Sequence, residues 1–456
     1  MGVVEEKSVK PIIKVRKMKR ITSIITCLVA CMQLASAQTT PRALARIIQR
    51  DTSLVAVARM ARQVLGEGFN AGSGYSQVWA RDLNTFIETA LEVNRPADVR
   101  GALLVFFAMQ QPNGECIDGY VVKKDFTWGD NHPYYSILDD IHVGFKNTVE
   151  TDQETSLIQA VCKYIRKTGD RSLLQEMVGD VTVLDRMQQM LDYLKRERYS
   201  EQYGLIYGAM TADWGDCQPL CDDVVDIHPD SPMAIDVYDN AMLMIALDDL
   251  QTVCTDAQRC QAWKQWHDDI AKNVRRHLWD KKRKKFIPHI YLGESPIPAG
   301  FDELEVYYHG GTAVAIEAGL LTTREIAQAN AKMLENVEKS GMPTIGLTLY
   351  PVYPDGFFHG GMAKPYVYQN GGDWTWFGGR MIQQLVHYGF CEEAYNELRP
   401  MLDRVIQNHG FYEWYGMGNV PSGSGKFKGS AGVLATAIEM LQDWSKKILD
   451  NEKEQL

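Results

Sequence analysis

The sequence is short of positive charge. It contains 48 Lys and Arg against 58 Asp and Glu, which gives a formal net charge of −10. Residues 1–37 carry seven Lys and Arg and two Glu, a net +5, so the remainder of the chain carries −15. Nucleic acids and anionic membrane surfaces both bind basic faces of proteins. The acidic remainder therefore argues against a nucleic-acid partner and against a role on a membrane surface.

Several catalytic and metal-binding patterns are also missing. No Gly-x-Ser-x-Gly nucleophile motif occurs, and the Gly-rich run at 416–432 matches no phosphate-loop pattern. The nine Cys form no pair or Cys/His cluster with zinc spacing, so no metal or other cofactor is implied. Two pairs lie close in sequence, Cys217 with Cys221 and Cys254 with Cys260. In an oxidising compartment either pair is a candidate disulfide.

The N-terminal segment has the pattern of an export signal. Lys19 and Arg20 precede an apolar stretch at 21–34, which is followed by three small residues at 35–37. The apolar stretch is short for a membrane span, and no other segment reaches that length. We interpret residues 1–37 as an export signal with an upstream extension and expect the protein in the bacterial periplasm or secreted. Residues 28–31 resemble a bacterial lipoprotein signal, so lipidation of Cys31 is the alternative.

Helical periodicity dominates the rest of the chain. Apolar residues recur at three- and four-residue spacing in twelve segments. These segments are 41–65, 83–93, 97–111, 151–169, 181–198, 232–254, 257–279, 309–321, 323–340, 372–389, 391–408 and 429–449. Six pairs of an apolar and an amphipathic helix can close into a ring with an inner and an outer layer. We therefore expect residues 38–456 to form a single all-α catalytic domain, an (α/α)6 barrel with long loops at one mouth.

The irregular segments between helical pairs combine aromatic residues, carboxylates, amides and glycine. Loops of this length in a compact domain are usually functional. Aromatic rings stack on the apolar faces of sugars, and Asp, Asn, Gln and Arg side chains bind hydroxyls. The sequence therefore predicts a pocket for a neutral sugar. Its candidate substrate-binding residues are Trp79, Arg81, Asp82, Trp128, Asp130, Trp214, Gln369, Asn370, Trp374, Trp376 and Trp414.

Some of these residues can also have a purely structural role. Arg81 and Asp82 can form a local ion pair at a helix start. Trp374 and Trp376 can be core aromatics. Glu413 is flanked by aromatic residues, which favours burial, and a buried carboxylate is a candidate for a functional role.

Four stretches, in chain order, resemble a known family. "VWARDLNTFI", "TADWGDC", "YQNGGDWTW" and "FYEWYG" are similar to motifs of the inverting glycosidases with six-hairpin barrels. That class includes the glucosidase domain of glycogen debranching enzymes, processing α-glucosidases, trehalases and neutral invertases. The resemblance covers about residues 70–445.

The resemblance implies roles for individual residues. Asp216 corresponds to the general acid, with Asp213 as its nearest competitor, and Glu413 to the general base. Arg81 and Asp82 correspond to residues that hold hydroxyls of the terminal sugar. Gln369 stands where the family has His, and this departure affects the expected sugar specificity. Inverting enzymes place acid and base about 6.5–9.5 Å apart so that a water fits between them.

The predicted function is hydrolysis, with inversion, that removes a terminal sugar from an oligosaccharide or small glycoside. An α-glucosyl substrate is implied by the resemblance alone, and the oligomeric state is not determined by the sequence. A sugar epimerase or an unsaturated-glucuronide hydrolase on the same barrel is one alternative; an epimerase would use paired His in the pocket. A non-catalytic exported glycan-binding protein is another.

Overall fold

The computed structural model describes residues 39–127, 133–219 and 224–453. Its first two helices, α2 (Pro41–Arg50) and α3 (Thr52–Leu65), replace the single helix expected at 41–65. The break falls at Asp51, whose carboxylate accepts a hydrogen bond from the Ser53 backbone N–H and so caps α3. A short acid at this position starts a new helix more readily than it continues the old one.

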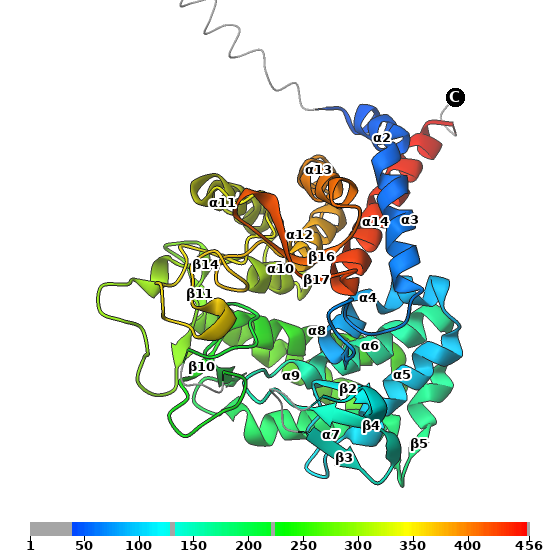
Figure 1. Cartoon of the computed structure of the whole chain (residues 1–456), viewed down its shortest axis with the longest axis vertical. Helices are drawn as coiled ribbons and strands as arrows, with labels where there is room; N and C mark the ends of the chain where they lie inside the picture. The colour runs from blue at the N-terminus through cyan, green and yellow to red at the C-terminus, as the bar shows by residue number, and fades with distance from the viewer. Residues whose placement is uncertain (1–38, 128–132, 220–223, 454–456) are drawn as a thin grey trace, which may run out of the picture.

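Six helices form an inner ring. They are α4 (Ala80–Val93), α6 (Gln153–Thr168), α8 (Val237–Val253), α10 (His309–Glu317), α12 (Thr375–His387) and α14 (Lys428–Lys453). Each contacts the next in this order, and α14 contacts α4, which closes the ring (Figure 1). Helices α8 and α10 are buried on most sides, as their apolar and small residues require.

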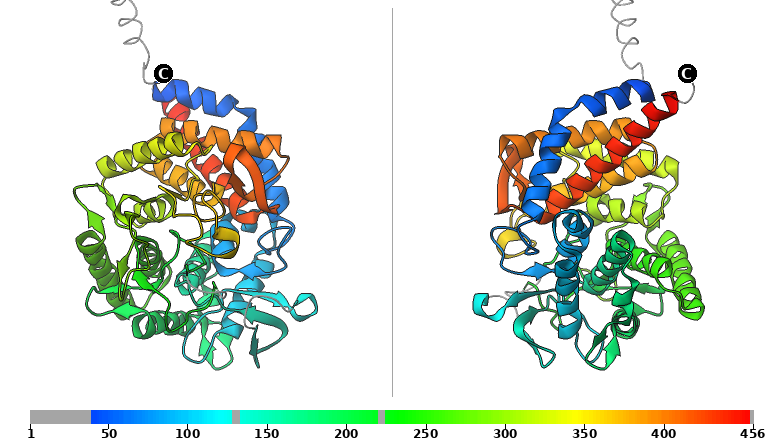
Figure 2. Two further views of the ribbon diagram at one scale, coloured as in Figure 1. Left: turned by 60° about the vertical axis from the view of Figure 1, so that its left-hand side comes forward. Right: turned by 90° about the vertical axis from the view of Figure 1, so that its right-hand side faces the viewer.

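The remaining helices other than α2 form an outer layer around this ring. They are α3, α5 (Pro96–Met109), α7 (Val183–Glu197), α9 (Ala257–His277), α11 (Thr323–Ser340) and α13 (Cys391–Gln407). Helix α9 is amphipathic and buries only Trp263, Ile270 and Val274, which lie on one face. Helices α2 and α3 lie beside α14, so the two ends of the described chain are neighbours (Figure 2). The expected (α/α)6 barrel is confirmed.

Short strands, which the sequence analysis did not predict, shape the loops. One antiparallel sheet has the order β1-β2-β4-β3 and consists of β1 (Val78–Trp79), β2 (Gly119–Val122), β3 (Pro133–Ser136) and β4 (Asp139–Phe145). A hairpin joins β16 (Tyr412–Gly416) and β17 (Val420–Gly425). A three-stranded sheet contains β9 (Gly208–Ala209), β10 (Met233–Ile235) and β13 (Ile290–Tyr291). These ladders hold long loops at one end of the barrel in fixed positions.

The other elements are brief. The two-stranded ladders are β5 (Met177–Val178) with β6 (Val181–Thr182), β7 (Tyr199–Ser200) with β8 (Leu205–Ile206), β11 (Trp279–Asp280) with β12 (Lys285–Phe286), and β14 (Tyr307–Tyr308) with β15 (Leu349–Tyr350). The 3-10 helices are η1 (Lys123–Asp125), η2 (Arg171–Gln175), η3 (Glu303–Glu305), η4 (Gly360–Met362) and η5 (Met417–Asn419). In the described part of the chain, no helix combines the length and the apolar character that crossing a membrane takes.

The cysteines that the structure describes are free thiols. Cys254 and Cys260 are not bonded to each other. Cys254 directly follows α8, and Cys260 in the first turn of α9 directs its thiol at the Cys254 carbonyl. Cys221, the expected partner of Cys217, lies outside the described residues, as does Cys31.

Candidate active site

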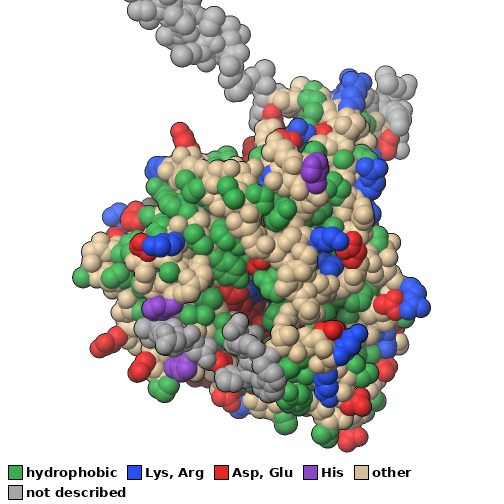
Figure 3. All heavy atoms as spheres, in the orientation of Figure 1, with side chains coloured by type: hydrophobic (Ala, Val, Ile, Leu, Met, Phe, Trp, Pro, Cys, Tyr) green, Lys and Arg blue, Asp and Glu red, His purple; other side chains and the backbone are tan. Residues whose placement is uncertain are grey.

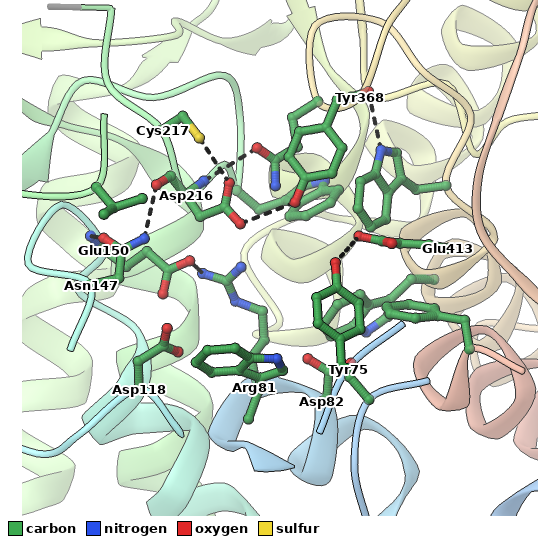
Figure 4. Close-up of a pocket in the computed structure, with 18 residues that line it drawn as sticks. Tyr75, Arg81, Asp82, Asp118, Asn147, Glu150, Asp216, Cys217, Tyr368 and Glu413 are labelled. Atoms are coloured by element: carbon green, nitrogen blue, oxygen red, sulfur yellow. Dashed lines mark hydrogen bonds and ion pairs between the residues drawn. The ribbon is translucent and has the colours of Figure 1, made fainter. Parts of the chain in front are cut away.

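A cavity of about 350 Å³ opens among the loops at one end of the barrel. Figure 3 shows it as a hollow with acidic side chains inside it. Seven of the predicted substrate-binding residues line it: Trp79, Arg81, Asp82, Trp214, Gln369, Trp374 and Trp376. Asp216 and Glu413 line the same cavity, although they lie far apart in the sequence of 456 residues. The fold therefore brings the two predicted catalytic carboxylates to one site (Figure 4).

Asp216 is held by several segments of chain. The Asn147 amide donates a hydrogen bond to its backbone carbonyl at 2.8 Å, and its backbone N–H donates to the Gln369 side-chain oxygen at 3.3 Å. The Tyr368 hydroxyl donates to one carboxylate oxygen at 3.3 Å, and the Cys217 thiol to the other at 3.4 Å. These contacts fix both the position of the loop and the orientation of the carboxylate.

Glu413 lies on β16 and is almost fully buried, with 4% of its surface exposed. One carboxylate oxygen accepts a hydrogen bond from the Ser424 backbone N–H at 2.7 Å, and the other from the Tyr75 hydroxyl at 2.8 Å. Burial raises the pKa of Glu413 and the nearby Asp216 adds to this, while the two hydrogen bonds oppose the rise. Gly423 has a positive φ of 68°, and a Cβ there would lie 2.5 Å from a Glu413 oxygen. Only glycine lets the hairpin pass so close to this carboxylate.

Tyr368 lies beside the Asp216 carboxylate. Its hydroxyl bonds Asp216, and burial together with the charges of Asp216 and Glu413 raises its pKa far above the ordinary value, so it stays a neutral donor. Its backbone has a positive φ of 51°, and its carbonyl accepts the Trp374 indole N–H at 3.1 Å. A strained tyrosine conformation held in this way is common at functional sites.

Arg81 pairs with carboxylates other than its sequence neighbour. Its guanidinium contacts Asp152 at 2.6 Å and Glu150 at 2.8 Å. Asp82 is buried, one of its carboxylate oxygens has no hydrogen-bond partner, and burial raises its pKa well above the usual range. The local Arg81–Asp82 ion pair is therefore not formed, and Asp82 lines the cavity with one buried oxygen unpartnered.

The tryptophans belong both to the core and to the cavity wall. Trp214 stacks on Phe377 with ring centroids 4.2 Å apart and meets the edge of Trp374 at 4.8 Å. The Trp376 indole N–H donates to the Thr85 hydroxyl at 2.6 Å. Each of the three indoles is at most 3% exposed. These three tryptophans are therefore core aromatics, and they also form part of the cavity wall.

Three of the predicted site residues do not line this cavity. The Asp213 carboxylate accepts hydrogen bonds from the Gly310 and Gly311 backbone N–H groups, both at 2.7 Å, and so caps α10. Asn370 bonds the backbone of Tyr353 through both ends of its amide. Trp414 packs on Tyr368 from outside the cavity. Trp128 and Asp130 lie outside the described residues.

Other lining residues were missed by the sequence analysis. They include Tyr75, Asp118, Asn147, Glu150, Cys217 and Tyr368. Tyr368 begins the stretch "YQNGGDWTW", and Tyr75 stands three residues before "VWARDLNTFI", so a signal for both existed. Asp118, Asn147 and Glu150 carry no local signal, because only the fold of the sheet brings residues 118–150 to the cavity.

The described lining of the cavity is strongly acidic. Its carboxyl and guanidinium side chains are those of Asp82, Asp118, Glu150, Asp216, Glu413 and Arg81. The single guanidinium is already paired with Glu150 and Asp152. Such a lining suits a neutral polyhydroxyl ligand better than an anion. Within 39–127, 133–219 and 224–453, no group of three His, Cys, Asp or Glu is arranged to hold a metal.

Known proteins share this fold and part of this sequence. The model of the glycosyl hydrolase 94 superfamily catalytic domain matches residues 49–402, a range that contains Asp216 and ends before Glu413. A GH63 mannosylglycerate hydrolase from Thermus thermophilus, solved with glucose, has a TM-score of 0.61 and 16% identity, covering 83% of this chain and 99% of that one. A Klebsiella oxytoca rhamnosidase with bound rhamnose has a TM-score of 0.54 and 14% identity, covering 85% of this chain and 63% of that one. At these identities the likeness shows the fold.

A curated relative matches over a shorter stretch. The N,N'-diacetylchitobiose phosphorylase of Vibrio proteolyticus is 36% identical over 93 residues, which are 19% of this chain. The match spans 11% of the length of that protein.

Proposed function

The chain belongs to the glycosyl hydrolase 94 superfamily, and from this premise we propose that it is a glycoside hydrolase that works with inversion. Asp216 is the general acid and Glu413 the general base. The observation that carries this proposal is their shared cavity, in which each carboxylate is oriented by its own set of hydrogen bonds. One carboxylate alone would not provide both proton transfers of a direct displacement by water.

The proposed reaction is a single displacement. Asp216 gives its proton to the glycosidic oxygen as the bond from that oxygen to the anomeric carbon breaks. A water molecule attacks the anomeric carbon from the opposite face and loses a proton to Glu413. The products are a free sugar of inverted configuration and an alcohol. Hydrogen bonds from Tyr75 and Ser424 direct the Glu413 carboxylate and favour its ionised form, which a base requires.

Phosphorolysis is the second candidate, because the curated relative is a phosphorylase. In that reaction phosphate replaces water, and the product is a sugar phosphate. The charges at the site weigh against it. A phosphate dianion would meet no free guanidinium in the described lining of the cavity, because the Arg81 side chain is already paired with Glu150 and Asp152.

A product assay decides between the two reactions. The protein is incubated with a panel of α-linked disaccharides and oligosaccharides, with and without inorganic phosphate. Hydrolysis predicts release of free sugar at a rate that phosphate leaves unchanged. A sugar 1-phosphate that forms only when phosphate is present would establish phosphorolysis, and binding without any product would support the glycan-binding alternative.

The substrate and the location of the enzyme are further parts of the proposal. We expect removal of a terminal sugar, α-glucosyl by the resemblance of the motifs, from an oligosaccharide or small glycoside. Export follows from the signal pattern at 19–37, which lies outside the described residues. N-terminal sequencing of the protein from cells tests it: cleavage after Ala37 supports a soluble exported enzyme, and a lipid-modified Cys31 supports an anchored one.

A further inference from the structure

Asp118 lines the cavity but has no role in the proposed reaction. It lies directly before β2, with its backbone N–H bonded to the Phe145 carbonyl at 2.9 Å and its carbonyl to the Ala80 N–H at 2.8 Å. The central sheet and the first residue of the inner helix α4 thus hold its backbone from both sides. Figure 4 shows its side chain on the same side of the cavity as Arg81 and Glu150.

The carboxylate of Asp118 has acceptor capacity that the protein does not use. Across the described residues, no side chain or backbone group donates a hydrogen bond to this carboxylate. The nearby Arg81 guanidinium forms its ion pairs with Glu150 and Asp152 instead. Burial raises the pKa of Asp118 to about 7, Arg81 opposes this, and Asp152 adds to it. The side chain is half-buried and lines the cavity, so a ligand bound there can donate hydrogen bonds to it.

An aromatic ring lines the same cavity as this carboxylate. Trp79 lies over Gly119, where a Cβ would come within 2.2 Å of the indole ring. Glycine therefore lets the ring lie against β2. A ring and a carboxylate in one cavity match a pyranose, which presents an apolar face to the ring and hydroxyls around its rim.

We propose that Asp118 is a sugar-binding residue that determines specificity, accepting hydrogen bonds from two adjacent hydroxyls of a sugar that stacks on Trp79. This inference rests on the proposed function only in taking a sugar as the ligand, and it does not depend on which reaction follows. The two oxygens of one carboxylate match the spacing of a pair of neighbouring hydroxyls. Asp82 lines the same cavity and can contact other hydroxyls of the same ring.

The test couples the side chain to single hydroxyls of the ligand. Binding of D-glucose, D-mannose, D-galactose and their 2-, 3-, 4- and 6-deoxy derivatives is titrated by tryptophan fluorescence, since four tryptophans line the cavity. The variants are Asp118→Asn and Asp118→Ala, and Asp140→Asn, an exposed acid on β4, is the matched control. Wild-type protein should lose about 10- to 100-fold affinity when a hydroxyl facing Asp118 is absent. In the Asp118 variants the same omission should cost less than about 3-fold, because the acceptor is already gone.

Thermal unfolding separates binding from a structural role. The folded-state pKa of Asp118 is raised above its unfolded value of 3.8, so its contribution to stability is present at low pH and is lost as the pH rises through about 7. At pH 8 the Asp118→Asn protein should therefore melt no lower than wild type. A lower melting temperature with unchanged sugar affinity would overturn the inference.

The outcomes distinguish this inference from the proposed function. Turnover with equal sugar affinity and equal deoxy-sugar losses in all variants would overturn the role of Asp118 and leave the hydrolase intact. Coupling to one or two adjacent hydroxyls without release of product would support Asp118 and contradict the hydrolase. If wild-type protein binds none of the sugars but releases product from a glycoside, the role of Asp118 is wrong and the hydrolase stands.

Discussion

The hydrogen bond from Tyr75 to Glu413 gives the sharpest prediction about the proposed base. Tyr75→Phe removes one hydroxyl and leaves the ring in place. That hydroxyl lies 2.8 Å from a Glu413 oxygen and lowers the pKa of the carboxyl against the effect of burial. Without it the pKa of Glu413 rises further, so less of the base is ionised at a given pH. The acidic limb of the profile of kcat/KM against pH should move to higher pH.

The expected loss of kcat/KM in Tyr75→Phe depends on the hydrogen bond that Glu413 keeps. A hydrogen bond to a charged acceptor contributes about 1.5–3 kcal/mol. The Ser424 N–H still holds the other Glu413 oxygen, so the lower part of this range applies, and kcat/KM near neutral pH should fall about 10- to 30-fold. At a pH well above the acidic limb, Glu413 is ionised in both wild type and Tyr75→Phe. Any loss of kcat/KM that remains there reports the orientation of the Glu413 carboxylate.

Tyr395→Phe is the matched control. The Tyr395 hydroxyl donates to the Asp51 carboxylate, also at 2.8 Å, far from the cavity. Its loss should lower stability by about 1 kcal/mol and leave the pH profile unchanged. An acidic limb of Tyr75→Phe that stays in place or moves to lower pH would refute the assignment of Glu413 as the group that must be ionised.

Four further substitutions test the site. Asp216→Asn and Glu413→Gln should each lower kcat by about 10²–10⁴-fold with circular dichroism like that of wild type, and near-native turnover in either would contradict the roles. Asp213→Asn should lower the free energy of unfolding by about 1–2 kcal/mol, because an amide N–H₂ cannot accept from the α10 N–H groups. The profile of kcat/KM against pH should stay unchanged. Intact stability with lost turnover would instead make Asp213 the acid. Gly119→Ala should displace the Trp79 ring and raise KM more than it lowers kcat, as measured by initial rates; an unchanged KM would argue against stacking on Trp79.

The barrel followed from the sequence because helical periodicity is a local signal. Eleven of the twelve expected segments each correspond to one helix, and the first is divided where Asp51 caps α3. The short strands were not predicted, because ladders of two residues carry no periodic pattern. Their register depends on partners far along the chain.

The candidate site was predictable only where the motifs lie. The stretches around Arg81, Asp216, Gln369 and Glu413 line one cavity, although the roles of these residues stay predictions. Asp213 was ambiguous because its two hydrogen-bond donors lie 97 and 98 positions away, and no local pattern reveals a helix cap at that distance. Asp118 was invisible for the same reason, since its place is fixed by backbone contacts to Ala80 and Phe145.

The stereochemistry of the first product tests the central claim most directly. Proton NMR of the anomeric signal, recorded before mutarotation, identifies which anomer the enzyme releases from an α-linked substrate. A water held between Asp216 and Glu413 predicts the β-anomer of the free sugar. Initial release of the α-anomer would contradict the account.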